Sequence, residues 1–508
     1  MQANIVPDTS LSELTQAHAT LKRSFRSGKL RDISYRKLQL AQLAYLLQDN
    51  YIAFQESLAR DFGKHPLEAN IGETGVVFER TLDAINNLDK WLASEDLSHE
   101  TNPMFSGFKP TLFKQSRGPV MIIGPFNAPI LLTLQPLMGA IAAGCPAIIK
   151  PSDLTIHTSS LIHTLVHKYL DSDCYRVVMG GVEQVTALLQ LKWSSICYTG
   201  GAQVGKIVAL AAAKQMTHVT LELGGKCPVI LDSNVDIDTA ARRILWGKMI
   251  NAGQVCISPD YVLTPRHIQD KFITSLKKAW NEFFPDGALK SPDTGGIIND
   301  RHFYRVLSML QHTKGEIVIG GNADVKRRKL EVTVVKDVQP GDSLLDDEIF
   351  GPILAVVPVS DVDEALEYIE GNPEPLAVYV FSQDEAFKTK VRENTISGSL
   401  IYNDTFFQLN VAQLPVTGIG ASGYGYQGGK YAFETFIHQR PSMDVPVEAE
   451  PHLSIRYPPY TQTTYDVLSQ GLLQTEVPLP RCQDKLANGK DLLAREAPPP
   501  SHQRGVPS

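Results

Sequence analysis

Apolar and polar residues recur along this chain with two different periods, and each period predicts a different kind of element. Between residues 11 and 60, leucines return at near-helical spacing among polar residues, which predicts helices. From Val120 onward, short apolar runs alternate with helix-like segments. The predicted strands of this first series are Val120–Ile123, Ala147–Lys150, Tyr175–Met179, Ser195–Thr199 and Val219–Leu223. Alternating strands and helices predict a parallel sheet that is covered on both faces.

A second alternating series predicts a second α/β lobe. Its strands are expected at Pro228–Leu231, Tyr261–Thr264, Ile353–Pro358, Ala377–Phe381 and Ser399–Tyr402. Residues 413–430 are rich in glycine, which predicts a loop. Prolines multiply after residue 441, and the polar, Pro-rich stretch from Glu496 is expected to be disordered.

The most apolar region, Met121–Ile149, is interrupted by four prolines and several glycines. A membrane-spanning helix needs about 20 continuous apolar residues, so a buried strand–helix–strand is the better interpretation. The length of 508 residues predicts two large lobes, because one domain holds roughly 100–200 residues. The net charge of −7 gives no sign of the basic patch that a nucleic-acid partner requires.

The six cysteines are scattered, without a C-x-x-C pair or a Cys/His spacing typical of zinc sites. This pattern predicts a reduced, intracellular protein without a metal site. Residues 1–10 contain no apolar stretch, so a secretory signal is not expected.

Three segments carry groups suited to acyl chemistry. In Asn251-Ala-Gly-Gln-Val-Cys256, a glycine relaxes the backbone shortly before a cysteine, whose thiolate could be a nucleophile. In Leu221-Glu-Leu-Gly-Gly225, Glu222 ends an apolar strand and could act as a general base. In Gly124-Pro-Phe-Asn127, the Asn127 carboxamide follows a strand and could donate to an oxyanion. Taken singly, each has an ordinary alternative, namely a buried apolar cysteine or a solvated residue at a strand end.

Three further segments stand out, and two of them suit a dinucleotide. Tyr198-Thr-Gly-Gly-Ala-Gln-Val-Gly205 combines a strand, a glycine turn and a helix start, which can hold a pyrophosphate on backbone N–H groups, although an ordinary βα turn is commoner. Lys150-Pro-Ser-Asp153 closes a predicted strand at the end that faces the ligand crevice of such sheets. Glu348-Ile-Phe-Gly-Pro352 is the third segment.

Together, these six segments resemble the aldehyde dehydrogenase superfamily in order and spacing from about residue 12 to residue 460, including the 34 residues between Glu222 and Cys256. Further segments resemble its class 3 branch, whose members oxidise medium-chain, fatty and aromatic aldehydes and are mostly dimers. These segments are Ser27-Gly-Lys, Ile297–Phe303, Pro375–Ser382, Phe433-Glu-Thr-Phe436 and Arg456-Tyr-Pro-Pro459. Some members carry a membrane-anchoring tail, but this tail lacks a long apolar run, so no integral anchor is expected.

The resemblance implies a role for each residue. Cys256 would attack the aldehyde, Asn127 and the Cys256 backbone N–H would hold the oxyanion, and Glu222 would activate water against the thioacyl enzyme. The product would be a carboxylic acid. The implied cofactor-binding residues are Lys150, Asp153, Gly200, Gly201, Gly205, Glu348 and Phe350.

The chain departs from the family pattern at two places that bear on specificity. Asp153 stands where glutamate is usual; a carboxylate there favours NAD over NADP, and a shorter one leaves NADP open. Val416 and Thr417 replace a Phe-Gly pair near the substrate funnel, and Phe126 and Ala128 replace bulkier aromatic residues around Asn127. The substrate preference is therefore expected only as a hydrophobic aldehyde.

The resemblance also implies a domain plan. It comprises a variant Rossmann cofactor domain with N-terminal helices, an α/β catalytic domain, a bridging segment and a partly disordered tail, at residues 1–223, 224–412, 413–445 and 446–508, with residues 100–118 contributing to a bridging hairpin. A cytoplasmic homodimer without nucleic-acid partners is expected.

Two other functions compete with this one. A CoA-acylating aldehyde dehydrogenase releases its thioester to a thiol and often dispenses with the base, so the retained Glu222 argues against it. A non-catalytic relative would usually have lost the nucleophile or the base, and both are present.

Overall fold

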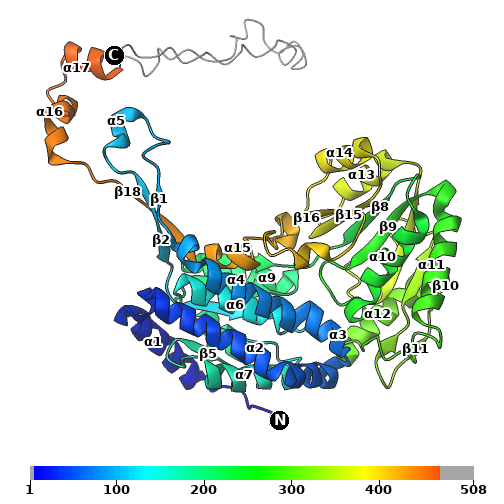
Figure 1. The fold of residues 1–508 in the computed structure, drawn as a ribbon. Helices are drawn as coiled ribbons and strands as arrows, with labels where there is room; N and C mark the ends of the chain where they lie inside the picture. Colours follow the sequence, from blue (N-terminus) through cyan, green and yellow to red (C-terminus); the bar gives the residue numbers. More distant parts are fainter. Residues whose placement is uncertain (1–4, 470–508) are drawn as a thin grey trace, which may run out of the picture. The chain divides into compact units, whose positions relative to one another are not determined.

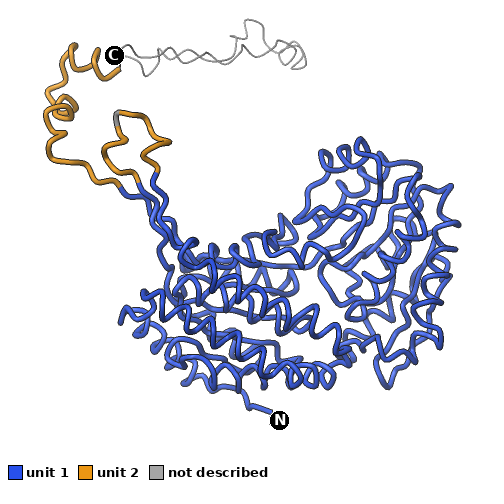
Figure 2. The backbone as a smooth tube through the Cα atoms, viewed as in Figure 1, with its two compact units in different colours: residues 1–96, 111–442 blue, residues 97–110, 443–508 orange. Residues whose placement is uncertain are grey.

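The computed structural model describes residues 5–469, so the predicted disorder from Glu496 lies outside the described residues. The described chain forms two compact units (Figure 2). Unit 1 comprises Met1–Asp96 and Thr111–Ser442, and unit 2 comprises Leu97–Pro110 and Met443–Ser508. The strands of both predicted α/β lobes therefore lie within unit 1, whereas residues 97–110 of the predicted cofactor domain belong to unit 2.

The first sheet of unit 1 confirms the predicted parallel series. Its strands, in spatial order, are β17 (Gly423–Tyr424), β7 (His218–Glu222), β6 (Ser195–Thr199), β3 (Val120–Ile123), β4 (Ala147–Lys150) and β5 (Tyr175–Val177). All neighbours pair in parallel except β17, which runs antiparallel to β7. The chain fills β3, β4 and β5 on one side and then returns to β6 and β7 on the other, so the order reverses between β3 and β6.

Alternating side chains of these strands enter two different cores, as the pleat of a strand requires. Val120 and Ile122 pack beneath one helix layer, whereas Met121 and Ile123 pack beneath the other. The first layer comprises α2 (Ile33–Phe62), α4 (Gly75–Leu92), α6 (Leu131–Ala143), α7 (Ile156–Tyr169) and α15 (Gly429–Thr435). The second comprises α1 (Leu11–Ser27), α8 (Val182–Leu189) and α9 (Ala202–Lys214). The predicted N-terminal helices and the strand–helix–strand over 121–149 are thus confirmed.

The second sheet of unit 1 is the predicted second lobe (Figure 1). Its strands, in order, are β10 (Glu316–Ile319), β13 (Thr333–Lys336), β14 (Ile353–Val359), β9 (Pro259–Pro265), β8 (Cys227–Leu231), β15 (Ala377–Phe381) and β16 (Ser399–Tyr402). Only β10 is antiparallel to its neighbour. The helices beside this sheet are α10 (Ile237–Met249), α11 (Gln269–Phe283), α12 (Asp300–His312), α13 (Val362–Glu370) and α14 (Glu385–Glu393).

The predicted glycine-rich loop over 413–430 is wrong at two points. Gly423 begins β17 and Gly429 begins α15. Gly423 has a φ of 116°, and a β-carbon there would clash with the Leu221 carbonyl oxygen. This glycine permits close approach to a neighbouring strand, which is a second use of glycine besides loop freedom.

A small antiparallel sheet and a hairpin complete unit 1. The small sheet consists of β1 (Glu95–Asp96), β2 (Thr111–Ser116) and β18 (Ile437–Ser442), and the hairpin consists of β11 (Ala323–Asp324) and β12 (Lys329–Leu330). Residues 100–118 and 413–445 thus each contribute a strand, β2 and β18, to one bridging sheet. The domain boundaries themselves remain predictions.

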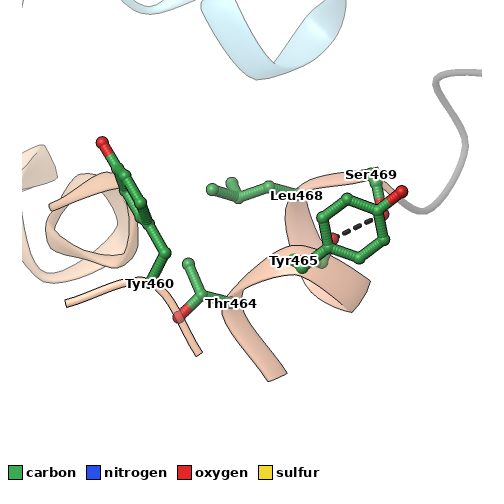
Figure 3. A pocket seen from close by; sticks show the side chains of 5 residues that line it. All are labelled: Tyr460, Thr464, Tyr465, Leu468 and Ser469. Carbon is green, nitrogen blue, oxygen red and sulfur yellow. Dashed lines mark hydrogen bonds between the residues drawn. The ribbon is translucent and has the colours of Figure 1, made fainter. Parts of the chain in front are cut away.

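Unit 2 contains short helices and a pocket. Its helices are α5 (Pro103–Ser106), α16 (Glu450–Leu453) and α17 (Gln462–Ser469). The pocket is lined by Tyr460, Thr464, Tyr465, Leu468 and Ser469 (Figure 3). None of the predicted site residues lines it. No helix within residues 5–469 combines the length and apolar character needed to cross a bilayer.

Candidate active site

Cys256 follows a backbone turn that L-amino acids rarely adopt. The turn is η3 (Ile250–Gly253), and three of its residues are left-handed, with φ of 54°, 52° and 69° at Asn251, Ala252 and Gly253. A β-carbon at Gly253 would clash with the Gly351 carbonyl oxygen, so only glycine fits. Strained backbone of this kind persists only where the surrounding structure holds it, and it clusters at active sites.

Gln254 supplies much of that hold. Its amide nitrogen donates to the carbonyl oxygens of Asn251 and Gly296, both at 3.1 Å. Its amide oxygen accepts the Ile298 backbone N–H at 3.0 Å. The turn before the sulfur is therefore fixed to the segment that leads into α12.

The Cys256 thiol is half-buried, with the carboxyl groups of Glu348 and Glu222 nearby. Burial raises the pKa of the thiol to about 12, and the nearby carboxylates of Glu348 and Glu222 act in the same direction. The backbone N–H groups of Cys256 and Ile257 oppose this rise because they stabilise the thiolate. The sulfur is thus a protonated thiol at neutral pH, within electrostatic reach of two carboxylates.

Glu222 ends β7 and is 4% exposed. Neither of its carboxylate oxygens has a hydrogen-bond partner among the described residues. Burial raises the pKa of this carboxyl group well above its usual value. A buried carboxyl without partners is costly to keep, and groups perturbed in this way concentrate at functional sites.

Asn127 lies in the loop that follows β3 and is 5% exposed. Its backbone carbonyl oxygen accepts a hydrogen bond from Asn251 Nδ2 at 2.8 Å and another from Lys64 Nζ at 3.3 Å. The loop that carries Asn127 is therefore hydrogen-bonded to the turn that precedes Cys256. The loop follows β3 of the first sheet, whereas the turn precedes β9 of the second sheet.

Lys150 ends β4, next to β3 in the first sheet. It is 3% exposed; its ammonium donates to the Gly180 carbonyl oxygen at 2.9 Å and lies 3.8 Å from Asp153 Oδ1. Burial lowers the pKa of this lysine. Because an ammonium group has three donors, Lys150 keeps donor capacity beyond the Gly180 bond.

The predicted phosphate-binding turn joins β6 to α9. Gly200 donates its N–H to the Glu222 carbonyl oxygen at 3.0 Å, and Gly205 donates to Gly201 at the same distance. A β-carbon at Gly205 would lie 2.7 Å from a Leu223 methyl, so the helix packs closely on the strand only because this residue is glycine. Gly201 faces open space.

Glu348 and Phe350 lie in the loop before β14. The Glu348 carboxylate rests against Gly224 and accepts a hydrogen bond from the Gly225 backbone N–H. Burial raises the pKa of Glu348 to about 8. The Phe350 ring lies 5.8 Å from that of Phe126, centroid to centroid, which places this loop beside the residue that precedes Asn127.

Several of the predicted site residues lie along one edge of the first sheet. Asn127, Lys150, Gly200 and Glu222 all stand at the carboxyl ends of parallel strands in the first sheet, around the point where strand order reverses. Open α/β sheets bind their ligands at this place. Within residues 5–469, no three side chains of the metal-binding types cluster closely enough to hold a metal ion.

Three other residues of this region belong to no motif that could be recognised from sequence. Lys64, Glu68 and Glu73 bond to the Asn127 loop or to the turn before Cys256. Charged residues beside Gly63 and Pro66 look in sequence like a solvated helix end, and a single sequence offers no sign of their burial.

The chain matches known proteins over most of its length. Residues 3–441 match the family described as the aldehyde dehydrogenase family. Over 443 residues, the chain is 40% identical to aldehyde dehydrogenase family 3 member A2 of Rattus norvegicus, covering 87% of this chain and 91% of that protein. It is 38% identical over 449 residues to the dimeric NADP-preferring aldehyde dehydrogenase of Canis lupus familiaris, covering 88% and 98%.

A solved structure agrees with these sequence matches. The substrate-bound state of Staphylococcus aureus AldH superposes with a TM-score of 0.87 at 36% identity, covering 90% of this chain and 99% of that one. The fold, the motifs and the relatives thus point to one conclusion. The chain belongs to the aldehyde dehydrogenase family, with family 3 members among its relatives, and is an NAD(P)-dependent aldehyde dehydrogenase.

Proposed function

We propose that this enzyme oxidises a hydrophobic aldehyde to the carboxylic acid through a thioester on Cys256. The observation that carries this proposal is that the half-buried Cys256 thiol interacts electrostatically with the buried Glu222 carboxyl group, which has no hydrogen-bond partner among the described residues. A nucleophile and a general base are the two groups that a covalent acyl mechanism requires.

Each step of this mechanism uses a side chain or backbone group described above. The Cys256 thiol gives up its proton to a water molecule and Sγ adds to the aldehyde carbon, whose carbonyl oxygen becomes an oxyanion held by the Asn127 amide and the Cys256 backbone N–H. A bound NAD(P)⁺ would supply the hydride acceptor, and loss of a hydride from that carbon restores the carbonyl group and leaves a thioester on Cys256. Glu222 then takes a proton from water, the resulting hydroxide adds to the thioester carbon, and the C–S bond breaks to release the acid and the sulfur.

The cofactor-binding residues predicted from sequence fit a dinucleotide. Lys150 has donors left for a ribose hydroxyl, and Glu348 can accept from the hydroxyls of the nicotinamide-side ribose. The open space at Gly201, in the turn from Gly200 to Gly205, suits the approach of a phosphate to the N-terminus of α9. Phe350 would pack near the nicotinamide.

We expect NAD to be preferred over NADP. Asp153 has a side chain that is 55% exposed beside the buried Lys150, where a carboxylate would meet the adenosine ribose. Its negative charge repels a 2′-phosphate and accepts from a 2′-hydroxyl. The canine relative is named NADP-preferring, so this preference has to be measured for this chain.

A panel of aliphatic and aromatic aldehydes, each with NAD and with NADP, tests the proposed function. We expect free acid as product, higher kcat/KM for apolar than for small polar aldehydes, and higher kcat/KM with NAD. The measurement follows reduced-nicotinamide absorbance and identifies the product, with and without CoA. Product formation that requires CoA and gives no free acid would favour the acylating mechanism instead.

We propose that the enzyme is a homodimer that associates through α9. Three apolar side chains lie on the exposed face of this helix, at 45%, 58% and 66% exposure for Val204, Ile207 and Leu210. Their spacing of three residues puts them on one stripe, and an uncovered apolar stripe marks an interaction surface. The canine relative is named dimeric.

The double variant Ile207→Glu/Leu210→Glu should be monomeric at micromolar concentration. Like charges brought together in a two-fold contact cost several kcal/mol, which corresponds to a rise of roughly 100-fold or more in the dimer dissociation constant. Light scattering coupled to size exclusion measures the mass. The matched control is Leu38→Glu/Ile52→Glu on α2, whose two side chains are exposed to a similar extent as those of Ile207 and Leu210. Loss of the dimer in this control as well would argue against α9 as the interface.

We further propose that the enzyme works in the cytoplasm. The five cysteines of the described residues are all free, as expected in a reducing compartment. Fractionation of cells that express the full chain tests this location, and recovery in a membrane pellet would contradict it.

A further inference from the structure

A buried ion pair lies next to the active-site loops but belongs to none of the motifs. Lys64 follows α2, and Glu73 lies in the π-helix η2 (Asn70–Thr74), beyond α3 (Pro66–Ala69). The two side chains form an ion pair and are 5% and 1% exposed. A buried ion pair is weak support for stability, because removing both charges from water offsets most of their attraction. Its position therefore calls for another explanation.

Both members of the pair hold the Asn127 loop. Lys64 Nζ also donates to the Asn127 carbonyl oxygen at 3.3 Å. Glu73 Oε2, the oxygen that faces away from Lys64, accepts the Ile130 backbone N–H at 2.8 Å. The loop is thus held at Asn127 itself and three residues further on, at the start of α6.

The same segment also holds the turn before the nucleophile. Glu68 Oε2 accepts the Asn251 backbone N–H at 3.0 Å. Asn251 Nδ2 in turn donates to the Asn127 carbonyl oxygen at 2.8 Å, the same oxygen that Lys64 contacts. Asn251 is left-handed, so these bonds help to keep a conformation that the chain would otherwise leave.

The π-helix accounts for the reach of this segment. In an α-helix, residues five apart point about 140° away from each other, because each turn has 3.6 residues. The wider turn of a π-helix closes a bond between residues five apart, here from the Gly75 N–H to the Asn70 carbonyl oxygen. Glu68 and Glu73 can then both face the junction of the two sheets, where Figure 1 shows α3.

We propose that Lys64, Glu68 and Glu73 are positioning residues, which set the Asn127 amide against Cys256 by tying both loops to one rigid segment. This inference rests on the roles proposed above for Asn127 and Cys256. A displacement of about 1 Å in a reacting group can lower turnover by roughly 100-fold. The positioning residues should therefore act on kcat through Asn127 and leave cofactor affinity unchanged.

A double-mutant cycle tests this inference. The paired variant Lys64→Met/Glu73→Gln removes both charges of the buried pair together, keeps an acceptor for the Ile130 N–H and removes the donor to the Asn127 backbone carbonyl oxygen. We expect it to lower kcat by about 10–100-fold in the parent enzyme, with an unchanged Kd for the cofactor. In an Asn127→Ala background, which by itself should lose roughly 10²–10³ in kcat, we expect the paired variant to change kcat by less than about threefold.

A second variant and a matched control complete the test. Asn251→Gly tolerates the left-handed conformation and removes the side-chain donor to the backbone carbonyl oxygens of Asn127 and Gln254. It should show a dependence on Asn127 in the same direction, and it replaces the paired variant if that chain does not fold. The control is Lys29→Met/Asp171→Asn, which neutralises another ion pair of the same unit without touching the site and should leave kcat unchanged.

The possible results separate the inference from the proposed function. An equal loss of kcat in the parent and Asn127→Ala backgrounds, or no loss in the parent, would overturn the positioning role. Full activity of Asn127→Ala by itself would instead overturn the proposed oxyanion role, whatever the paired variant does.

Discussion

Replacing Cys256 by serine should lower kcat for aldehyde oxidation by about 10³-fold or more, with cofactor binding intact. A serine hydroxyl is a far weaker nucleophile than a thiolate, and its proton is much harder to remove than that of a thiol. Turnover is followed by the absorbance of reduced nicotinamide, and cofactor binding by calorimetry on the same preparation. Retention of the parental kcat would show that the thioester does not form at this residue.

The matched control is Cys174→Ser. Cys174 is a buried cysteine at the amino end of β5 whose sulfur contacts the Tyr35 hydroxyl, away from the carboxyl ends of the strands. This variant should keep its activity. A second readout is alkylation of the sulfur at 256: because burial raises its pKa to about 12, the rate should climb continuously over about pH 7 to 10 without reaching a plateau.

Replacing Glu222 by glutamine should stop the reaction halfway. The first turnover should still produce a burst of reduced cofactor equivalent to one per active site, because acylation needs the sulfur and the oxyanion donors. Steady-state turnover should fall by about 10²–10⁴-fold, since an amide cannot take the proton from water. Rapid-mixing absorbance measures the burst, and mass spectrometry measures the accumulated acyl adduct.

Two further measurements sharpen this prediction. In the parent enzyme, thioester hydrolysis should accelerate as pH rises, because the pKa of Glu222 lies well above 4.5 and only its ionised form is a base. Glu331→Gln, at another buried carboxylate that holds Asn322, should leave turnover unchanged. Steady turnover of Glu222→Gln at the parental rate would mean that a different group activates water.

The same substitution should also stabilise the protein, and the sign follows from the pKa. Folding raises the pKa of Glu222, so the native state binds this proton more tightly than the unfolded chain does. The side chain therefore destabilises the fold increasingly as pH rises above 4.5, towards its native pKa. Glu222→Gln should have a higher Tm than the parent at neutral pH, and the difference should shrink as pH falls towards 4.5.

Most of the strand framework could be predicted from sequence because strands such as β3, β4, β6 and β15 are buried on both faces. The expected bounds of β3, β4, β6, β15 and β16 agree with the structure residue for residue. Continuous apolar runs bounded by glycine or proline identify such strands well. The edge strand β10 and its neighbour β13 were not predicted, because β10 is half-polar and pairs with β13 across a long stretch of chain.

Part of the site could also be predicted from sequence, because the motif residues stand at strand ends. The positions of Glu222, Lys150 and Asn127 follow from where β7, β4 and β3 stop. The ties between them could not be predicted, because Lys64 and Asn251 bond to Asn127 across long stretches of chain. The left-handed Ala252 was also unforeseen, since no local preference of alanine favours that conformation.

The antiparallel β17 bears on how the enzyme is synthesised. The strand that carries Glu222, β7, has a free edge until Gly423 and Tyr424 pair with it. Strand β2 likewise has a free edge until β18 pairs with it. A nascent polypeptide that already contains both the nucleophile and the base therefore still exposes unpaired backbone. Competence for catalysis is acquired only late in translation, and prematurely terminated chains ending before Gly423 should be captured by chaperones or aggregate.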